Sequence, residues 1–233
     1  MKTIGLIGGM SWESSVTYYR SLNEIVKQRL GGLHSAKIVL YSVDFYEIEQ
    51  LQRRGDWLQA GDLLADAAQA LERAGADCVV LCTNTMHKVA DQIQTAVKIP
   101  LLHIADATAK RICDAGLNKV GLLATRFTME QDFYIGRFAD RNGIEVRVPN
   151  AKDRDIVHRI IYEELCLGQI RADSRAQYRR IMADMVEREG VQAIILGCTE
   201  ISLLVDQSDA SVPLFDTTAI HAQAVADFAL SKD

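Results

Sequence analysis

The chain has few of the features that mark nucleic-acid-binding, zinc-binding or membrane proteins. Its net charge is only −5, and no cluster of Lys and Arg creates a basic field for nucleic acid. The 5 cysteines form no CxxC pair and are odd in number, and the chain has no signal-like start, so we expect reduced thiols in the cytoplasm rather than disulfides or zinc ligands. No apolar run approaches the length needed to cross a bilayer.

The glycine-rich start lacks the GxGxxG pattern of dinucleotide-binding proteins. Gly5, Gly8 and Gly9 in "GLIGG" are spaced differently, and we expect them to let a substrate or Met10 approach the backbone closely. The chain has only 3 prolines and no Pro/Ser-rich linker, so we expect its two halves to pack closely.

What the chain does contain is an internal repeat. "RAGADCVVLCTNT" resembles "REGVQAIILGCTE", and both Gly75/Gly190 and Thr83/Cys198 are 115 positions apart (190 − 75 and 198 − 83). "KTIGLIGGMS" resembles "NKVGLLATRF", and "KIPLLHI" resembles "SVPLFDT", at offsets of 116 and 113 (121 − 5 and 213 − 100). Three matches in the same order predict two copies of one α/β unit.

Continuous apolar runs such as "CVVL" and "AIIL" alternate with helical patterns, which predicts parallel sheets covered on both faces. The fold class we expect is α/β, with two similar doubly wound domains related by a pseudo-twofold axis and an active site between them. The first domain should comprise residues 1–104 plus 209–233, and the second residues 105–208. Strands are expected at Thr3–Gly8, Lys37–Val43, Cys78–Cys82, Leu101–Ile104, Lys119–Leu123, Glu145–Val148, Ala193–Gly197 and Leu214–Asp216. Helices are expected at Trp12–Arg29, Trp57–Ala74, Met86–Val97, Thr128–Arg141, Asp155–Gly168, Ser174–Glu189 and Thr217–Ser231.

Two reactive side chains follow equivalent strands of the repeat. Ligands of open α/β sheets bind at the carboxyl ends of the strands, where Thr83 and Cys198 both fall. If the halves face each other, these two residues stand on opposite walls of one cleft. Strand side chains alternate between faces, so the neighbouring Cys82 should point elsewhere. The alternative for Cys198 is a small buried core cysteine; we expect Cys78, Cys113 and Cys166 to be core residues.

The surroundings of these strand ends favour negative charge. We expect Cys198 to precede a helix N-terminus, which commonly lowers a thiol pKa. Backbone N–H groups at Asn84, Thr85, Thr199 and Glu200 are positioned to hold a carboxylate, although simple helix capping by Asn84 and Thr85 explains those two residues equally well. His87 is either a proton-transfer group or a hydrogen-bonded structural histidine.

At these residues the chain resembles the aspartate/glutamate racemase family from end to end. The resemblance lies in "IGLIGGMSWESS" (Ile4–Ser15), "CTNTMHKVAD" (Cys82–Asp91), "IADAT" (Ile104–Thr108) and "LGCTEISLL" (Leu196–Leu204). "VDFYEIEQLQRRGDW" (Val43–Trp57) and "EELCLGQI" (Glu163–Ile170) are similar to the subgroup of broad-specificity amino-acid racemases.

The resemblance implies a racemase of free amino acids that needs no cofactor, neither pyridoxal phosphate nor a metal. In that family two thiols flank the substrate Cα; one removes the proton and the other returns it to the opposite face. This sequence keeps one thiol, Cys198, and carries Thr83 where the family motif usually has cysteine. A hydroxyl is a far weaker acid than a thiol, so it can protonate a carbanion but is a poor base.

The resemblance also implies a substrate pocket and an assembly. Met10 and Gln52 should line the pocket, Glu200 should meet the α-ammonium group, and the chain should form a homodimer. The preferred side chain stays open, because Arg53 and Arg54 suit a carboxylate whereas Gln52 and Met10 suit an uncharged polar chain such as that of homoserine. Arg53 and Arg54 are otherwise an ordinary solvated pair.

Three alternatives remain at this point. A lone thiol also suits a single-cysteine isomerase or decarboxylase-like enzyme of the same superfamily. A site that has lost one catalytic group suits a non-catalytic amino-acid-binding protein. Finally, the "CT" motifs can be plain helix starts, which leaves the repeated pattern without a function.

Overall fold

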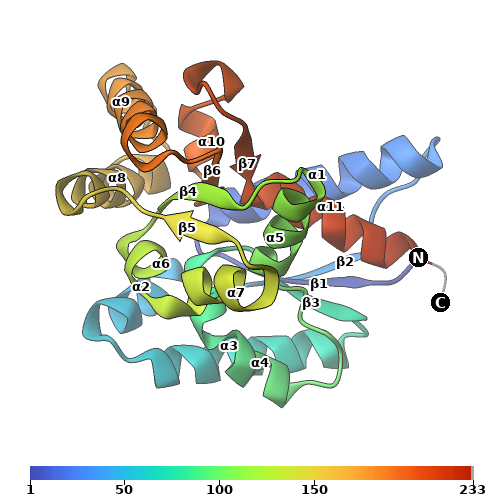
Figure 1. Ribbon diagram of the computed structural model, residues 1–233. Helices are drawn as coiled ribbons and strands as arrows, with labels where there is room; N and C mark the ends of the chain where they lie inside the picture. Colours follow the sequence, from blue (N-terminus) through green and yellow to red (C-terminus); the bar gives the residue numbers. More distant parts are fainter. Residues whose placement is uncertain (232–233) are drawn as a thin grey trace. The chain divides into compact units, whose positions relative to one another are not determined.

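The structure, a computed structural model, describes residues 1–231 of the chain (Figure 1). It consists of two compact units, one formed by Met1–Ile104 with the segment that begins at His221, the other by Ala105–Ile220. The return to the first unit therefore comes later than the expected residue 209. The reason is that residues 214–216 form the last strand of the second unit's sheet.

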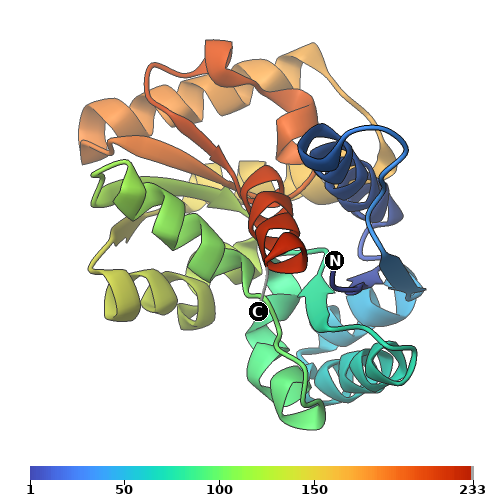
Figure 2. The same cartoon turned by 90° about the vertical axis from the view of Figure 1, so that its right-hand side faces the viewer.

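The first unit is built on three parallel strands, β1 (Ile4–Gly8), β2 (Ile38–Ser42) and β3 (Cys78–Leu81), in the order β2-β1-β3. Leu101 adds an isolated parallel bridge beside Val79. In this unit α3 and α4 lie side by side (Figure 2). Its helices are α1 (Trp12–Leu30), α2 (Phe45–Arg54), α3 (Trp57–Arg73), η1 (Thr85–Val89) and α4 (Ala90–Ala96).

Alternate residues of β3 enter two separate hydrophobic cores, one on each face of this sheet. Val79 and Leu81 pack with residues of α2 and α3. Cys78, Val80 and Cys82 pack with residues of α1 and α11 (Thr217–Leu230). Burial on both faces is the reason that the strand reads as an unbroken apolar run.

The second unit has four parallel strands in the order β5-β4-β6-β7. They are β4 (Lys119–Ala124), β5 (Glu145–Arg147), β6 (Ala193–Gly197) and β7 (Leu214–Asp216). Its helices are α5 (Ile104–Asp114), α6 (Arg126–Glu130), α7 (Asp132–Asn142), α8 (Ala151–Glu163), η2 (Leu165–Leu167), α9 (Ala172–Glu189), α10 (Ile201–Leu204) and η3 (Gln207–Asp209).

Both units have the same strand order, since β2-β1-β3 followed by the Leu101 bridge matches β5-β4-β6-β7. In each unit the first strand of the chain is paired on both sides, and a crossover returns to a parallel neighbour. The repeat found in the sequence thus corresponds to two copies of one topology, and the expected α/β class with two similar parallel sheets is confirmed.

The sequence-based assignment fails mainly around residue 104. Leu101–Ile104 is not a strand, because only Leu101 bridges to β3 and Ile104 already begins α5. The helices α2 and α5 were not expected. The expected helix Thr128–Arg141 is two helices, since Gln131 has an extended backbone, and Met86–Val97 divides into η1 and α4.

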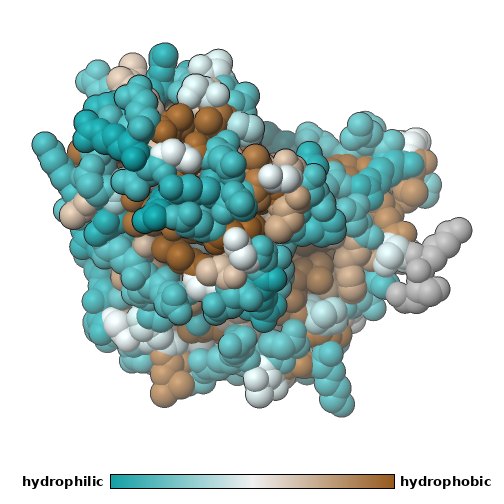
Figure 3. Space-filling view, in the orientation of Figure 1, coloured by the Kyte–Doolittle hydropathy of each residue, from teal (hydrophilic) through white to brown (hydrophobic). Residues whose placement is uncertain are grey.

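Hydrophilic residues cover most of the face seen in Figure 3, with hydrophobic ones in smaller groups between them. Within residues 1–231, no helix combines the length and the apolar character needed to span a membrane.

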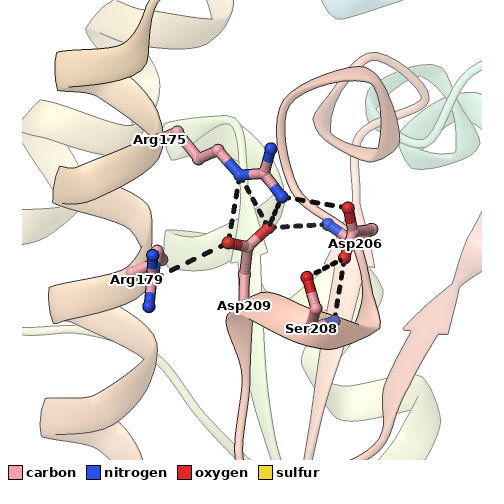
Figure 4. A network of polar contacts seen from close by, with 5 residues as sticks. All are labelled: Arg175, Arg179, Asp206, Ser208 and Asp209. Carbon is pink, nitrogen blue, oxygen red and sulfur yellow. Dashed lines mark hydrogen bonds and ion pairs between the residues drawn. The ribbon is translucent and has the colours of Figure 1, made fainter.

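An ionic network ties η3 to α9 in the second unit (Figure 4). Arg175 Nε donates to both carboxylate oxygens of Asp209 at 3.0 and 2.9 Å, and its Nη2 donates to Asp206 at 2.9 Å. Arg179 approaches Asp209 at 3.6 Å, and Asp206 accepts from the backbone and hydroxyl of Ser208. The network fixes the connection from α10 to β7.

We expect Asp209→Asn to destabilise the protein in a pH-dependent way. The hydrogen bond from Arg175 lowers the Asp209 pKa in the folded state. The resulting stabilisation is fully present above the unfolded-state pKa of about 3.9 and is lost as the pH falls through the lower folded-state value. The difference in unfolding free energy between the parent and the variant, measured in urea, should therefore be larger near pH 7 than near pH 3. Asp227→Asn, which breaks the exposed pair with Arg29, is the control and should change little. A difference that grows on acidification would contradict this account.

The loop after β1 is packed too tightly for a side chain at Gly9. Gly9 has φ +90°, and a Cβ there would collide with the Val43 carbonyl oxygen. The Gly9 N–H donates to Ser15 Oγ at 2.7 Å, and the Val43 N–H donates to the Gly8 carbonyl at 3.1 Å. The glycine therefore lets the loop lie directly against the end of β2, and its close neighbour is Val43 rather than the substrate or Met10 that we expected.

Gly9→Ala should cost clearly more stability than Gly75→Ala, a matched control with φ +86° and open space around the Cβ position. The control loses roughly 1 kcal/mol from the left-handed backbone alone. Gly9→Ala adds an overpacking cost of roughly 1–3 kcal/mol. Equal losses in urea unfolding would show that the loop yields and that the close approach is not needed.

Candidate functional site

Cys82 and Thr83 are neighbours at the end of β3, but their side chains lie in different surroundings. The Cys82 N–H donates to the Ile7 carbonyl at 3.0 Å, and its side chain lies fully buried in the core beside α1 and α11. Burial raises the pKa of the Cys82 thiol. Cys82 is thus a core residue, and the segment beyond the sheet starts with Thr83.

The Thr83 backbone is held by a side chain rather than by the sheet. No backbone hydrogen bond joins β1 to Thr83 anywhere in the described part of the chain, and His87 Nδ1 lies 2.8 Å from the Thr83 carbonyl oxygen. Thr83 is 9% exposed, and its hydroxyl makes no hydrogen bond with residues 1–231. Asn84 stands at the start of η1, but its side chain does not cap it, so capping does not explain Asn84.

Cys198 directly follows β6 and lies against a carboxylate. Its Sγ donates to Glu200 Oε2 at 2.9 Å, and Thr199 Oγ1 donates to the same oxygen at 2.6 Å. Glu200 is 3% exposed. The structure thus brings together three of the expected site residues, Cys198, Thr199 and Glu200. The thiol–carboxylate contact was not expected; its only sequence signal is a carboxylate two positions after the cysteine.

The expected lowering of the Cys198 pKa is wrong. Burial first, and then the negative charge of Glu200, raise the pKa of the Cys198 thiol well above its usual value. The nearby Cys166 thiol and the hydrogen bond to Glu200 act in the same direction, and only the Glu200 backbone N–H opposes them. The following helix, α10, has 4 residues, and its short length gives it little dipole to offset these terms.

Cys166 belongs to the surroundings of this thiol rather than to a plain core position. It lies in η2 and is half-buried. Tyr178 on α9 is fully buried, and burial raises the pKa of its hydroxyl. Three side chains, Cys198, Cys166 and Glu164, raise this pKa further. Glu164 in turn accepts a 2.5 Å hydrogen bond from Ser174.

The remaining expected residues lie in the first unit. Gln52 is buried, and its Nε2 lies 3.0 Å from Met86 Sδ, so it contacts the segment that follows Thr83. Met10 is 5% exposed and packs in the same hydrophobic core as Met86. Its role in lining a substrate pocket stays a prediction.

Arg53 and Arg54 contact their own helix. Arg53 pairs with Glu49, and Arg54 Nε donates to the Gln50 carbonyl at 3.3 Å. These contacts are those of an ordinary solvated pair. Within residues 1–231, no group of three His, Cys, Asp or Glu side chains is arranged to hold a metal ion.

Each unit thus presents one proton-carrying side chain at the carboxyl end of its third parallel strand, a hydroxyl after β3 and a thiol after β6. Ligands of α/β sheets bind at the carboxyl ends of the strands, and a thiol or hydroxyl placed there is a candidate acid–base group.

Residues 7–225 match the model of the Asp/Glu/Hydantoin racemase family, and the chain belongs to this family. The chain is 22% identical to the broad-specificity amino-acid racemase RacX of Bacillus subtilis (strain 168). This similarity extends over 232 residues and covers 95% of each of the two chains.

Solved structures of the same family share the whole fold. A candidate Asp/Glu racemase from Yersinia pestis is 63% identical, with a TM-score of 0.93 over 99% of this chain and 100% of that one. An aspartate racemase homologue from Pyrococcus horikoshii OT3 is 38% identical, with a TM-score of 0.86 over 99% and 100% of the two chains.

We expect Glu200→Gln to make the Cys198 thiol more reactive. The substitution removes a negative charge that raises the thiol pKa, so the thiolate fraction at a given pH should rise. Alkylation by iodoacetamide, followed peptide by peptide in a mass spectrometer, should accelerate at Cys198 by at least about threefold, which corresponds to a fall of half a pKa unit. The exposed Cys113 provides an internal reference, and Glu187→Gln on the exposed face of α9 is the control. Unchanged or slower alkylation of Cys198 would show that Glu200 does not set its pKa.

Proposed function

We propose that the protein is a cofactor-independent amino-acid racemase in which Cys198 and Thr83 exchange protons with opposite faces of the substrate Cα. The observation that carries this proposal is the pair of equivalent strand ends. One ends in the Cys198 thiol, which is hydrogen-bonded to the buried Glu200 carboxylate, and the other ends in the Thr83 hydroxyl. Membership of the racemase family supports the same reaction class.

The Cys198 step starts from the neutral thiol. The thiol proton passes along its 2.9 Å hydrogen bond to Glu200, which leaves a thiolate and a neutral carboxylic acid. The thiolate then takes the α-proton, and the electron pair of the Cα–H bond moves into the substrate carboxylate as an enolate-like charge. The α-ammonium group of a bound substrate lowers the cost of the thiolate by adding positive charge nearby. Glu200, which was expected to meet that ammonium, serves here first as the acceptor of the thiol proton.

The Thr83 step completes the inversion. The carbanion takes a proton from the Thr83 hydroxyl on its other face, and the resulting alkoxide recovers a proton from water. The hydroxide formed then takes the proton that Glu200 holds, which restores the Glu200 carboxylate and water. Backbone N–H groups at Asn84–Thr85 and Thr199–Glu200 hold the substrate carboxylate and stabilise its added charge. Met10 and Gln52 border the substrate side chain, which is that of aspartate, glutamate or a broader set including homoserine. The expected homodimer stays a prediction.

The test is α-hydrogen exchange in D₂O with a panel of L- and D-amino acids, followed by NMR and chiral chromatography. For the enantiomer that presents its α-hydrogen to Cys198, deuterium should enter faster than the configuration inverts. For the other enantiomer, exchange should occur only as inversion occurs. Cys198→Ala should abolish exchange of both enantiomers, a loss of at least about 10²-fold for one acid–base group.

Variants of Thr83 separate the two steps. Thr83→Ala should keep exchange of the first enantiomer and lose inversion, whereas Thr83→Cys should let both enantiomers exchange before they invert. Unchanged exchange in Cys198→Ala would end the proposal. Loss of carbon dioxide or isomerisation of a diacid would indicate the single-cysteine enzyme instead, and tight binding without exchange would indicate a binding protein.

A further inference from the structure

His87 contacts two backbone groups that come from different parts of the first unit. Its Nδ1 lies 2.8 Å from the Thr83 carbonyl oxygen, and its Nε2 accepts a 3.3 Å hydrogen bond from the Ile104 N–H. His87 itself is 3% exposed. Ile104 is the last residue of the first unit before the chain crosses into the second, and it begins α5.

These two contacts determine where the imidazole carries its proton. A backbone amide can only donate, so Nε2 must present its lone pair to Ile104. A carbonyl can only accept, so Nδ1 must carry the hydrogen that it donates to Thr83. Both nitrogens of a neutral ring are thereby engaged, and His87 is not placed to exchange protons with a substrate.

The Thr83 carbonyl needs such a donor, because β3 has ended at this point and the residue is buried. A buried carbonyl without a partner costs roughly 1–3 kcal/mol, so the backbone of Thr83 would otherwise turn to find one. Any such turn redirects the Thr83 hydroxyl as well.

The second unit has a related contact that is shifted by one residue. At the repeat offset of 115, Ser202 corresponds to His87 (202 − 87), and its Oγ donates to the carbonyl of Thr199 at 3.2 Å. Ser202 also hydrogen-bonds Asp216, the last residue of β7. At the offset of 113, Asp216 corresponds to His103 (216 − 103), whose ring lies 4.4 Å from that of His87. The Ser202 contact falls one residue later than the His87 contact, because Thr199 corresponds to Asn84 (199 − 84 is 115). The Cys198 carbonyl instead accepts from the Ile201 N–H at 3.1 Å. Within residues 1–231, a side-chain donor to the carbonyl of the reactive position is thus found at Thr83 and not at Cys198.

A second histidine, His221, lies where the chain returns from the second unit to the first. His221, the first residue back in the first unit, donates from Nε2 to the Leu102 carbonyl and accepts at Nδ1 from Tyr18 Oη, both at 2.8 Å. Burial lowers its pKa to about 4, so the ring is neutral, as this pattern requires. Its ring centroid lies 6.0 Å from that of His87.

We propose that His87 is a positioning residue that holds the Thr83 backbone, and through it the Thr83 hydroxyl, in the orientation needed to protonate the substrate. The inference rests on the proposed function. It assigns to the "H" of "CTNTMH" a task in the inversion step alone, because proton removal by Cys198 does not use Thr83.

The variants His87→Asn and His87→Gln each keep one of the two hydrogen bonds that His87 makes. Asn places its Nδ2 donor near the position of Nδ1 and keeps the bond to Thr83, whereas Gln places an acceptor near the position of Nε2 and keeps only the bond to Ile104. We expect the ratio of inversion to α-deuterium exchange, measured with the enantiomer that faces Cys198, to fall at least about tenfold in His87→Gln and to stay within about threefold in His87→Asn. The ratio is insensitive to partial unfolding, since unfolded molecules contribute to neither rate.

A second readout does not depend on catalysis. Three-bond couplings to the Thr83 methyl carbon report its χ1 angle by NMR, and we expect a single rotamer in the parent and His87→Asn but averaging in His87→Gln. Equal ratios and equal couplings in the two variants, or a parallel fall of both rates, would overturn the positioning role. A parent protein that exchanges no α-hydrogen would instead overturn the proposed function, and the couplings would still decide the role of His87.

Discussion

The hydrogen bond from the Cys198 thiol to Glu200 is the interaction on which the proposed proton transfer depends. It presents two opposing effects. The carboxylate raises the pKa of the half-buried Cys198 thiol and so disfavours the thiolate that the proposed reaction needs. Each thiolate that does form is a stronger base, which suits the removal of a weakly acidic α-proton. The contact that raises the pKa also supplies the path by which the proton leaves, and this combination lets one residue pair both protect and activate the thiol.

The strand end at Thr83 has a different requirement in the proposed reaction, because a threonine hydroxyl that only donates a proton must be oriented rather than ionised. The two units support the segments after β3 and β6 with side chains at equivalent positions but with different contacts. His87 reaches the Thr83 carbonyl and Ser202 the Thr199 carbonyl, each from just beyond the strand that carries the reactive residue. The carbonyl of Thr83 therefore depends on a side chain, whereas the carbonyl of Cys198 accepts from a backbone N–H within its own turn.

Much of this fold was predictable because the apolar runs are buried on both faces and are bounded by glycine. The bounds of β6 and β7 agree with the prediction, and the repeat corresponds to two sheets with matching strand order. The strand predicted at residues 101–104 was wrong because a short apolar run fits a strand and a helix start equally well. The α5 pattern was nonetheless present, since Ile104, Thr108 and Ile112 are buried at a spacing of four.

The electrostatics of the site could not be predicted in the same way. A helix was expected after Cys198, but α10 is a single turn, and the sequence gives no direct measure of how much protein surrounds the thiol. The contact between Cys198 and Glu200 depends on the turn formed by residues 198–200, and the approach of Cys166 depends on packing between segments far apart in the chain. Tertiary packing therefore reverses the sign of a pKa shift that local sequence suggested.

A hydroxyl in place of a thiol has a thermodynamic consequence for the proposed reaction. Free enantiomers have equal free energies, so the ratio kcat/KM must be the same in both directions whatever the catalyst. A weak acid at Thr83 slows inversion equally from either side, because protonation by the hydroxyl in one direction is deprotonation by its alkoxide in the other. The asymmetry of the site can therefore appear only in quantities that do not depend on the ratio kcat/KM for inversion. These are the rate of exchange of the hydrogen that faces Cys198 and the separate values of kcat and KM.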